Sequence, residues 1–355
     1  MAEISLCMIV RDEEDVLRRC LESAAPLVDE IIIADTGSKD KTCEIAREFT
    51  DQVYHFDWCD DFAAARNFAF SKASKPFCMW LDADDVILPE DQQKFLARKG
   101  ELEQADVVMM PYHTGFDEAG RVVYTFDRER IVRSSPQYRW QGRIHEVIVP
   151  AGRIVLWEAA VTHKKLRVHD PDRNLRIFEA MRSAGEEFSA RDQYYYGREL
   201  MFHHRIEEAK QVLEAFLSRP EGWVENKISA CQDLARCHRE AGEPGLAMQA
   251  VCRAFLYDIP RPVGCCQLGD YFRERGQYEN AIFWYHLALS MKVKARGSFE
   301  QPDYEGYIPY LQLCVCYDRL GRHETARRCN RLAWELKPDS EICAGNEAYF
   351  QSILP

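Results

Sequence analysis

The order of apolar and polar residues divides this chain of 355 residues into two parts. In the first part, short runs that are apolar on both faces alternate with amphipathic stretches. This order predicts parallel strands in a sheet that helices cover on both faces. The predicted strands are Ile4–Val10, Glu30–Ala34, Gln52–Asp57, Phe77–Leu81 and Asp106–Pro111. The predicted helices are Glu13–Ser23, Asp40–Phe49, Phe62–Ala73 and Pro89–Arg98.

From about residue 115 the apolar runs become shorter and the residues between them more polar. We expect these runs to form antiparallel strands that fold over the edge of the sheet. They are Arg121–Phe126, Glu129–Val132, Ile144–Val149 and Ile154–Leu156.

After about residue 170 the pattern predicts helices in pairs. A small residue recurs where the second helix of each pair begins, at Ala209, Ala247, Ala281 and Ala326. The intervals of 38, 34 and 45 residues lie around the tetratricopeptide period of about 34. The sequence therefore predicts a Rossmann-like α/β domain over residues 1–170, a linker helix over 171–190 and an all-α superhelical domain over 191–355.

Composition narrows the classes of function. A net charge of −12 disfavours a broad surface for nucleic acid or an anionic membrane. The 14 cysteines lack disulfide and zinc spacings, and several lie inside apolar runs, so we expect reduced thiols in a cytoplasmic protein. We expect neither a membrane span nor a signal peptide, because no long apolar run and no basic-then-apolar leader is found.

The most informative segment is Asp82-Ala83-Asp84-Asp85, which directly follows the apolar run Phe77–Leu81. Carboxylates are hard oxygen ligands for a divalent ion that also binds phosphate. At the end of a parallel strand they would lie at the carboxyl edge of the sheet, where open α/β folds bind ligands. The segment therefore predicts a metal and phosphate site.

Two other segments carry candidate chemistry. Asp35 ends the second strand, and its carboxylate could accept hydrogen bonds from a nucleotide base, although an ordinary strand–helix turn is the favoured interpretation of this segment taken alone. Arg66 lies early in a predicted helix, where its guanidinium could bind phosphate. The alternative for Arg66 is a surface ion pair with Asp60 or Asp61.

Taken together, four segments resemble the family-two glycosyltransferases of the GT-A fold, in this order and at these spacings. They are Met8–Glu14, Asp35–Thr42, Phe62–Asn67 and Asp82–Asp85. The resemblance covers residues 4 to about 165. With its helical tail, the chain is also similar to glycosyltransferases of the SunS type, which glycosylate bacteriocin peptides.

The resemblance implies an inverting transferase that uses a UDP-sugar, such as UDP-glucose, together with Mn²⁺ or Mg²⁺. Asp35 would contact the uracil, Arg66 the diphosphate or sugar, and Asp82 the ribose or sugar, while Asp84 would hold the metal. The implied donor-binding residues are Val10, Arg11, Glu13, Asp35, Arg66, Asp82, Ala83, Asp84 and Lys165.

Later residues complete the expected site. Glu146 is the carboxylate that the sequence places best for a general base, and neighbouring His145 would point to the opposite face if both lie on a strand. His163, or else His169, would be a further metal ligand, and Lys165 could close over the diphosphate.

We expect the helical part to bind a peptide or protein acceptor, or to pair subunits into a homodimer. Three alternatives stay open at this point: a tetratricopeptide adaptor with a non-catalytic nucleotide-sugar domain, a transferase acting on a glycan or lipid, and a two-metal phosphotransferase or nuclease. The residues do not specify the sugar or the linkage.

Overall fold

The computed structural model describes residues 2–166, 170–291 and 299–354 and divides into two compact units. The first unit comprises Met1–Gly115 and Thr125–Glu186, and the second comprises Phe116–Tyr124 and Glu187–Pro355. The main division therefore falls at residue 186, within the segment predicted to be the linker. We describe each unit by itself.

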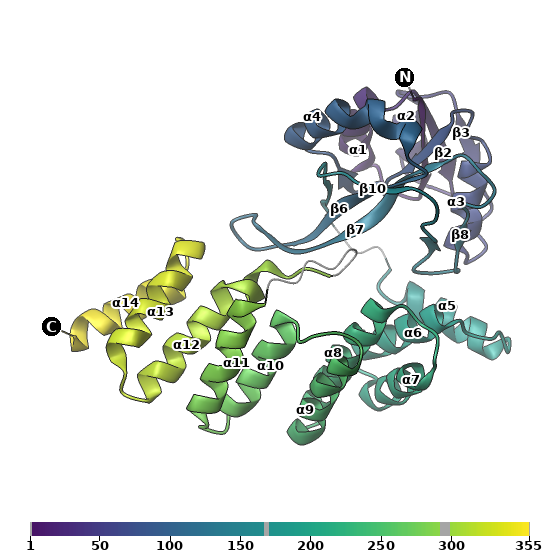
Figure 1. The fold of residues 1–355 in the computed structure, drawn as a ribbon. Helices are drawn as coiled ribbons and strands as arrows, with labels where there is room; N and C mark the ends of the chain where they lie inside the picture. The colour runs from purple at the N-terminus through teal and green to yellow at the C-terminus, as the bar shows by residue number, and fades with distance from the viewer. Residues whose placement is uncertain (1, 167–169, 292–298, 355) are drawn as a thin grey trace. The chain divides into compact units, whose positions relative to one another are not determined.

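A sheet of nine strands forms the centre of the first unit (Figure 1). Its order is β3-β2-β1-β4-β7-β6-β11-β5, and β10 pairs with β6 beside this path. These strands are β1 (Ile4–Val10), β2 (Glu30–Asp35), β3 (Val53–His55), β4 (Phe77–Trp80), β5 (Asp85–Val86), β6 (Val107–Phe116), β7 (Val122–Arg133), β10 (Ile154–Leu156) and β11 (Val161–His163). A second sheet pairs β8 (Trp140–Gln141) with β9 (Val147–Ile148).

Alternating residues of β1 enter two different cores, so apolar side chains fill both faces of the sheet. Leu6 and Met8 pack in a core that includes Leu17 of one helix and Phe95 of another, whereas Cys7 packs in a second core. The helices of this unit are α1 (Leu17–Ala24), α2 (Thr42–Arg47), α3 (Phe62–Phe70), α4 (Pro89–Arg98) and α5 (Arg173–Ser183). The predicted α/β fold, with a parallel sheet covered on both faces, is confirmed at β1, β2, β3 and β4.

The later strands differ from the prediction of antiparallel strands at the edge. β7 is one continuous strand in the middle of the sheet, antiparallel to β4, and the polar residues Asp127 and Arg128 had made it look like two. β10 and β11 run parallel to β6. Of Ile144–Val149 only Val147–Ile148 is extended, because the preceding backbone turns at His145, whose φ is 50°.

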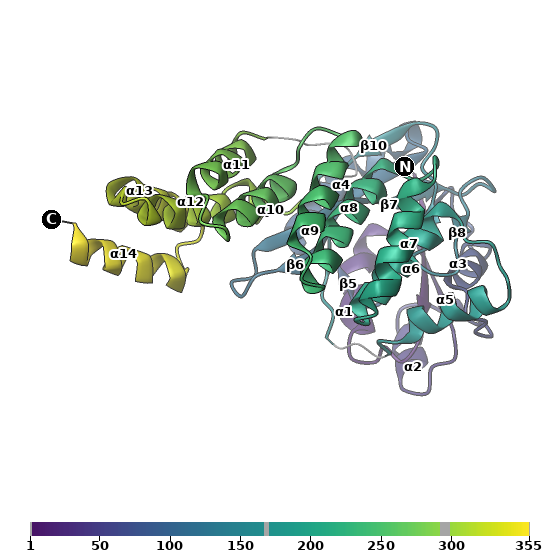
Figure 2. The same cartoon turned by 90° about the horizontal axis from the view of Figure 1, so that it is seen from below.

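The second unit consists of helices that contact one another in pairs (Figure 2). They are α6 (Ala190–Phe202), α7 (Ile206–Ser218), α8 (Val224–Glu240), α9 (Pro244–Arg253), α10 (Pro262–Arg273), α11 (Tyr278–Ser290), α12 (Tyr307–Arg319), α13 (His323–Leu336) and α14 (Glu341–Ile353). The recurring alanines are all buried in the second helix of a pair, as predicted: Ala209, Ala247, Ala281 and Ala326. The predicted all-α C-terminal part is confirmed.

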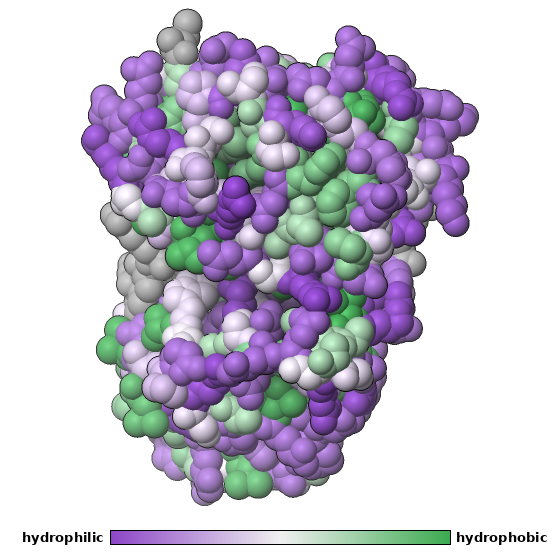
Figure 3. Space-filling model, turned by 90° about the vertical axis from the view of Figure 1, so that its right-hand side faces the viewer, coloured by the Kyte–Doolittle hydropathy of each residue, from purple (hydrophilic) through white to green (hydrophobic). Residues whose placement is uncertain are grey.

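Polar side chains dominate the face shown in Figure 3, and apolar ones occur in groups between them. Across the described ranges, no helix combines the length and the apolar character that crossing a membrane requires.

Two helical glycines offer a matched test of packing in the second unit. A methyl group on Gly269 of α10 would come within 2.5 Å of the ring of Tyr285, which is buried and held by a hydrogen bond to Asp270. A methyl group on Gly245 of α9 would meet no atom within 4 Å. We expect Gly269→Ala to lower the free energy of unfolding by about 1–3 kcal/mol, whereas Gly245→Ala should leave it unchanged or slightly higher. Urea unfolding followed by circular dichroism measures both, and equal effects would contradict this packing.

Candidate active site

The loops that follow β1 and β2 hold each other by reciprocal hydrogen bonds. The backbone N–H of Asp12 donates to Ser38 Oγ at 3.0 Å, and that of Lys39 donates back to Asp12 Oδ1 at 2.7 Å. The N–H of Glu13 donates to Thr42 Oγ1 at 2.7 Å. The carboxyl ends of these neighbouring strands therefore form one fixed rim.

Asp35 lies beside Val10 in the register of β1 and β2. Its side chain accepts hydrogen bonds from the backbone N–H groups of Gly37 at 3.2 Å and Ser38 at 3.1 Å. Gly37 has a φ of 103°, which permits this tight turn. The structure thus places the predicted base-binding residues Val10 and Asp35 together, with exposed Arg11 and half-buried Glu13 on the loop next to them. Their roles stay predictions.

Arg66 of α3 joins two carboxylates from distant parts of the chain. Its Nη2 lies 2.6 Å from Asp82 Oδ1, and its Nε lies 2.6 Å from Glu146 Oε1. The guanidinium also lies over the rings of Trp80 and Trp140, 5.0 and 4.8 Å from their centroids. The alternative of a surface pair with Asp60 or Asp61 is therefore wrong, because Arg66 is buried and faces the end of β4.

The charges of this group shift its pKa values in opposite directions. Burial lowers the pKa of Arg66, but Asp82 and Glu146 raise it more, so the net pKa is raised. Burial raises the pKa of Asp82, but the charges of Arg66 and Arg130 outweigh burial and lower it to about 2. Asp82 is therefore ionised at neutral pH.

A second buried arginine, Arg130 of β7, stabilises the turn after β4. Arg130 and Asp85 are both fully buried, and Arg130 Nη1 lies 3.0 Å from Asp85 Oδ2. The same carboxylate accepts hydrogen bonds from the backbone N–H of Asp82 at 3.0 Å and from Tyr112 Oη at 2.9 Å. Burial, followed by the charge of Asp85, raises the pKa of Tyr112 well above its usual value, so the phenol keeps its proton.

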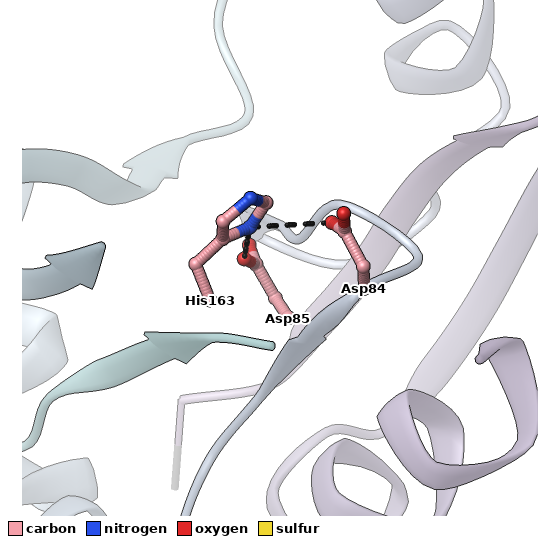
Figure 4. Close-up of side chains that lie close together, drawn as sticks. All are labelled: Asp84, Asp85 and His163. Atoms are coloured by element: carbon pink, nitrogen blue, oxygen red, sulfur yellow. Dashed lines mark hydrogen bonds and ion pairs between the residues drawn. The ribbon is translucent and has the colours of Figure 1, made fainter. Parts of the chain in front are cut away.

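His163 at the end of β11 completes this cluster (Figure 4). Its Nδ1 lies 3.3 Å from Asp84 Oδ1 and 3.3 Å from Asp85 Oδ1. Burial lowers the pKa of His163, but the two carboxylates outweigh it and raise the pKa to about 10. The structure thus brings together Asp84 and His163, the two predicted ligands; the alternative, His169, lies outside the described residues.

The cluster of Asp84, Asp85 and His163 has the chemistry of a metal site. One ligand atom from each residue lies within 4.8 Å of the others. Carboxylates and an imidazole suit Mn²⁺, and carboxylates also suit Mg²⁺. The residues therefore fit a divalent ion, although Asp85 is already engaged by Arg130.

Glu146 and Lys165 differ in how the structure holds them. Neither Glu146 nor His145 lies on a strand, so the condition under which their side chains would point to opposite faces is not met. It follows a left-handed residue, and its side chain is only 12% exposed because it pairs with Arg66. Lys165 is exposed, and the residue before it donates its backbone N–H to Asp84 O at 2.9 Å. Ala83, inside the turn, is buried.

The sequence missed Tyr112, Arg130 and the anchoring role of Asp85. Asp85 belongs to the acidic segment Asp82–Asp85 that the sequence pattern singled out, but the segment did not predict its pairing with Arg130. Tyr112 and Arg130 lie within strands whose place beside β4 and β11 depends on the topology. No local pattern distinguishes them from other strand residues.

Comparison with known proteins identifies the family of the N-terminal region. Residues 5–159 match the model of the glycosyl transferase family 2. Residues 5–159 form a domain of this family. The chain thus combines an N-terminal glycosyltransferase domain of family 2 with a C-terminal unit that carries a tetratricopeptide repeat, matched over residues 264–292.

Several relatives resemble the chain over part or most of its length. A TPR repeat-containing protein of Synechococcus elongatus is 29% identical over 72% of this chain and 75% of its own length. The glycosyltransferase SunS of Bacillus subtilis is 30% identical over 40% of this chain and 34% of SunS. The lipopolysaccharide core biosynthesis glycosyltransferase LpsC of Rhizobium meliloti is 29% identical over 42% of this chain and 58% of LpsC. The chain thus matches about a third of SunS and less than two thirds of LpsC.

Solved structures resemble the chain more distantly. The crystal structure of S. aureus TarS covers 84% of this chain and 96% of its own, at 12% identity and a TM-score of 0.37.

The pair between Arg66 and Asp82 predicts a pH dependence of stability. The pKa of Asp82 in the folded chain, about 2, lies below the usual value of about 3.9. Its contribution to stability is therefore complete above that usual value and is lost as the pH falls toward 2. In Arg66→Met the pKa of Asp82 should rise toward the usual value, so unfolding would no longer take up a proton at this carboxylate, and we expect the melting temperature to fall less between about pH 5 and pH 3 than that of the wild type.

Melting temperatures from about pH 3 to pH 7 measure this difference. Arg47→Met, at an exposed position of α2, is the control and should follow the wild type. An Arg66→Met profile parallel to that of the wild type would contradict the assignment.

Proposed function

We propose that this chain is a metal-dependent, inverting family 2 glycosyltransferase that transfers a sugar from a UDP-sugar, such as UDP-glucose, to a peptide or protein side chain. The observation that carries the proposal is the cluster of Asp84, Asp85 and His163 at the carboxyl edge of the sheet. Beside it, Arg66 connects the turn after β4 to Glu146. These groups offer sites for an ion, a diphosphate and a proton.

The donor would bind along the rim formed by β1, β2 and β4. Val10, Arg11, Glu13 and Asp35 would face the uracil and ribose, while Asp82 and Ala83 would contact the ribose or sugar. Asp84 and His163 would hold Mn²⁺ or Mg²⁺, which when bound supplies positive charge to the departing diphosphate. Lys165 would add charge from the exposed segment after β11.

Arg66 has an N–H group that could bind a phosphate or sugar oxygen of the UDP-sugar. Its Nε and Nη2 pair with Glu146 and Asp82, whereas its buried Nη1 makes no hydrogen bond within the described part of the chain. A buried donor without a partner is costly. If a phosphate or sugar oxygen of the bound UDP-sugar accepted a hydrogen bond from Nη1, this free-energy cost would be removed.

Glu146 would act as the general base. Only its Oε1 is engaged among the described residues, so Oε2 remains for the acceptor. The acceptor hydroxyl would give its proton to Glu146 while its oxygen bonds to the anomeric carbon. The bond from that carbon to the diphosphate breaks, UDP leaves with the electron pair, and attack from the opposite face inverts the configuration.

The helical unit would recognise the acceptor or pair two copies of the chain, because stacked helix pairs present extended surface. The resemblance to SunS-type transferases favours a peptide acceptor, whereas the name of LpsC, a lipopolysaccharide core biosynthesis glycosyltransferase, favours a lipopolysaccharide. A glycan or lipid acceptor is therefore the alternative. All 14 cysteines are free thiols, which fits action in the cytoplasm.

Asp84→Ala tests the metal and donor site. UDP with Mn²⁺ should raise the melting temperature of the wild type, because a ligand that binds only the folded state stabilises it by about 2.7 kcal/mol at 100 times its Kd. Asp84→Ala should lose this increase and the turnover, yet melt normally without ligand. Asp51→Ala, an exposed carboxylate elsewhere in the unit, is the control. A normal response of Asp84→Ala to UDP and Mn²⁺ would remove Asp84 from the site.

Glu146→Gln tests the base. We expect donor binding to persist and transfer to fall by about 10²-fold or more, because proton transfer of this kind contributes that much. The loss should be milder for a thiol acceptor, which ionises more easily. Release of UDP from a panel of UDP-sugars measures transfer when candidate peptides are present and hydrolysis when they are absent. Glu44→Gln, at an exposed position of α2, is the control. If donor affinity falls while transfer from bound donor stays normal, Glu146 belongs to the donor site instead.

A further inference from the structure

Asp85 connects the turn after β4 with three other strands of the first unit. Its Oδ2 pairs with Arg130 of β7 at 3.0 Å and accepts a hydrogen bond from the backbone N–H of Asp82 at 3.0 Å. Its Oδ1 accepts a hydrogen bond from Tyr112 of β6 at 2.9 Å and lies 3.3 Å from Nδ1 of His163 on β11. Both oxygens of this fully buried carboxylate are therefore occupied.

The chemistry of the side chains in this network determines which of their atoms carry the hydrogens. Arg130 keeps its charge, so Asp85 beside it is a carboxylate and only accepts. The single hydroxyl hydrogen of Tyr112 goes to Asp85. The phenol oxygen also lies 3.0 Å from Nδ1 of His163, where it can then only accept. Nδ1 must carry a hydrogen, and a neutral His163 has its lone pair on Nε2.

We infer that Asp85 and Tyr112 are positioning residues, which hold Nδ1 of His163 as a donor and so present Nε2 to the divalent ion. The inference rests on the proposed function, in which Asp84 and His163 hold that ion. Histidines that bind metals usually donate their other ring N–H to a carboxylate, a carbonyl or water, which fixes the ring. Asp85 and Tyr112 provide such acceptors on one side of the imidazole.

Asp84 and Asp85 therefore have different tasks, although both lie near His163. The side chain of Asp84 is 20% exposed, and within the described ranges no lysine or arginine pairs with it. Asp84 Oδ1 also lies 3.3 Å from Nδ1 of His163, so Asp84 must turn toward Nε2 to share an ion with His163, and it can do so without breaking a pair with a lysine or arginine. If Asp85 turned instead, Arg130 would remain as an unpaired charge in the core, which is strongly unfavourable.

Binding of Mn²⁺ to the full chain, measured by electron paramagnetic resonance, tests this inference through Tyr112→Phe. The substitution removes only the hydroxyl group. We expect the Kd for Mn²⁺ to rise by about 10-fold, as for other residues that orient metal ligands, while the melting temperature stays close to that of the wild type. Tyr138→Phe is the matched control, because Tyr138 is also buried and its hydroxyl donates to Ala151 O at 3.0 Å, outside this network. The control should bind Mn²⁺ as the wild type does.

The ring itself provides a second readout. Nitrogen NMR of the Mg²⁺-loaded wild type, with the signals of His163 identified by their loss in His163→Gln, should show a hydrogen on Nδ1. An unchanged Kd in Tyr112→Phe, or Nδ1 without a hydrogen in the loaded protein, would overturn the positioning role alone. A wild-type chain that binds neither ion would overturn the metal site of the proposed function, and this inference with it.

Discussion

The ion pair between Arg130 and Asp85 determines where the other groups of the candidate site lie. Both side chains are fully buried, so neither charge can be left without its partner. Asp85 in turn accepts the backbone N–H of Asp82, which fixes the turn after β4, and the hydroxyl of Tyr112, which lies against His163. The position of β7 beside β4 supplies this arginine, and the fold thereby sets the geometry of the carboxylates.

A second arginine, Arg66, pairs with two of the remaining carboxylates and leaves Asp84 without an arginine partner among the described residues. Arg66 binds Asp82 and Glu146 and lies over two tryptophan rings, so its position is set by packing as well as by charge. Asp84 differs from these carboxylates because, among the described residues, its only ionic partner is His163. Two arginines thus compensate the carboxylates that shape the site, and Asp84 is left for an incoming ion.

The sequence predicted the elements whose pattern is local. The bounds of β1 and α4 were predicted as observed, and the acidic turn was recognised from the apolar run before it. The central place of β7 was not predicted, because it depends on pairing between segments about fifty residues apart, as in Phe77 with Arg133. For the same reason the partners of Arg66 and Asp85 came only from the fold. The roles of the site residues remain predictions.

Diffraction from crystals grown with UDP and Mn²⁺, measured at the manganese absorption edge, tests the account most directly, because it locates the ion without reference to activity. The account predicts one anomalous peak within coordination distance of Asp84 and His163, next to the diphosphate, with Asp85 still paired to Arg130. A peak at another site, or bound UDP without any ion near Asp84, would contradict it.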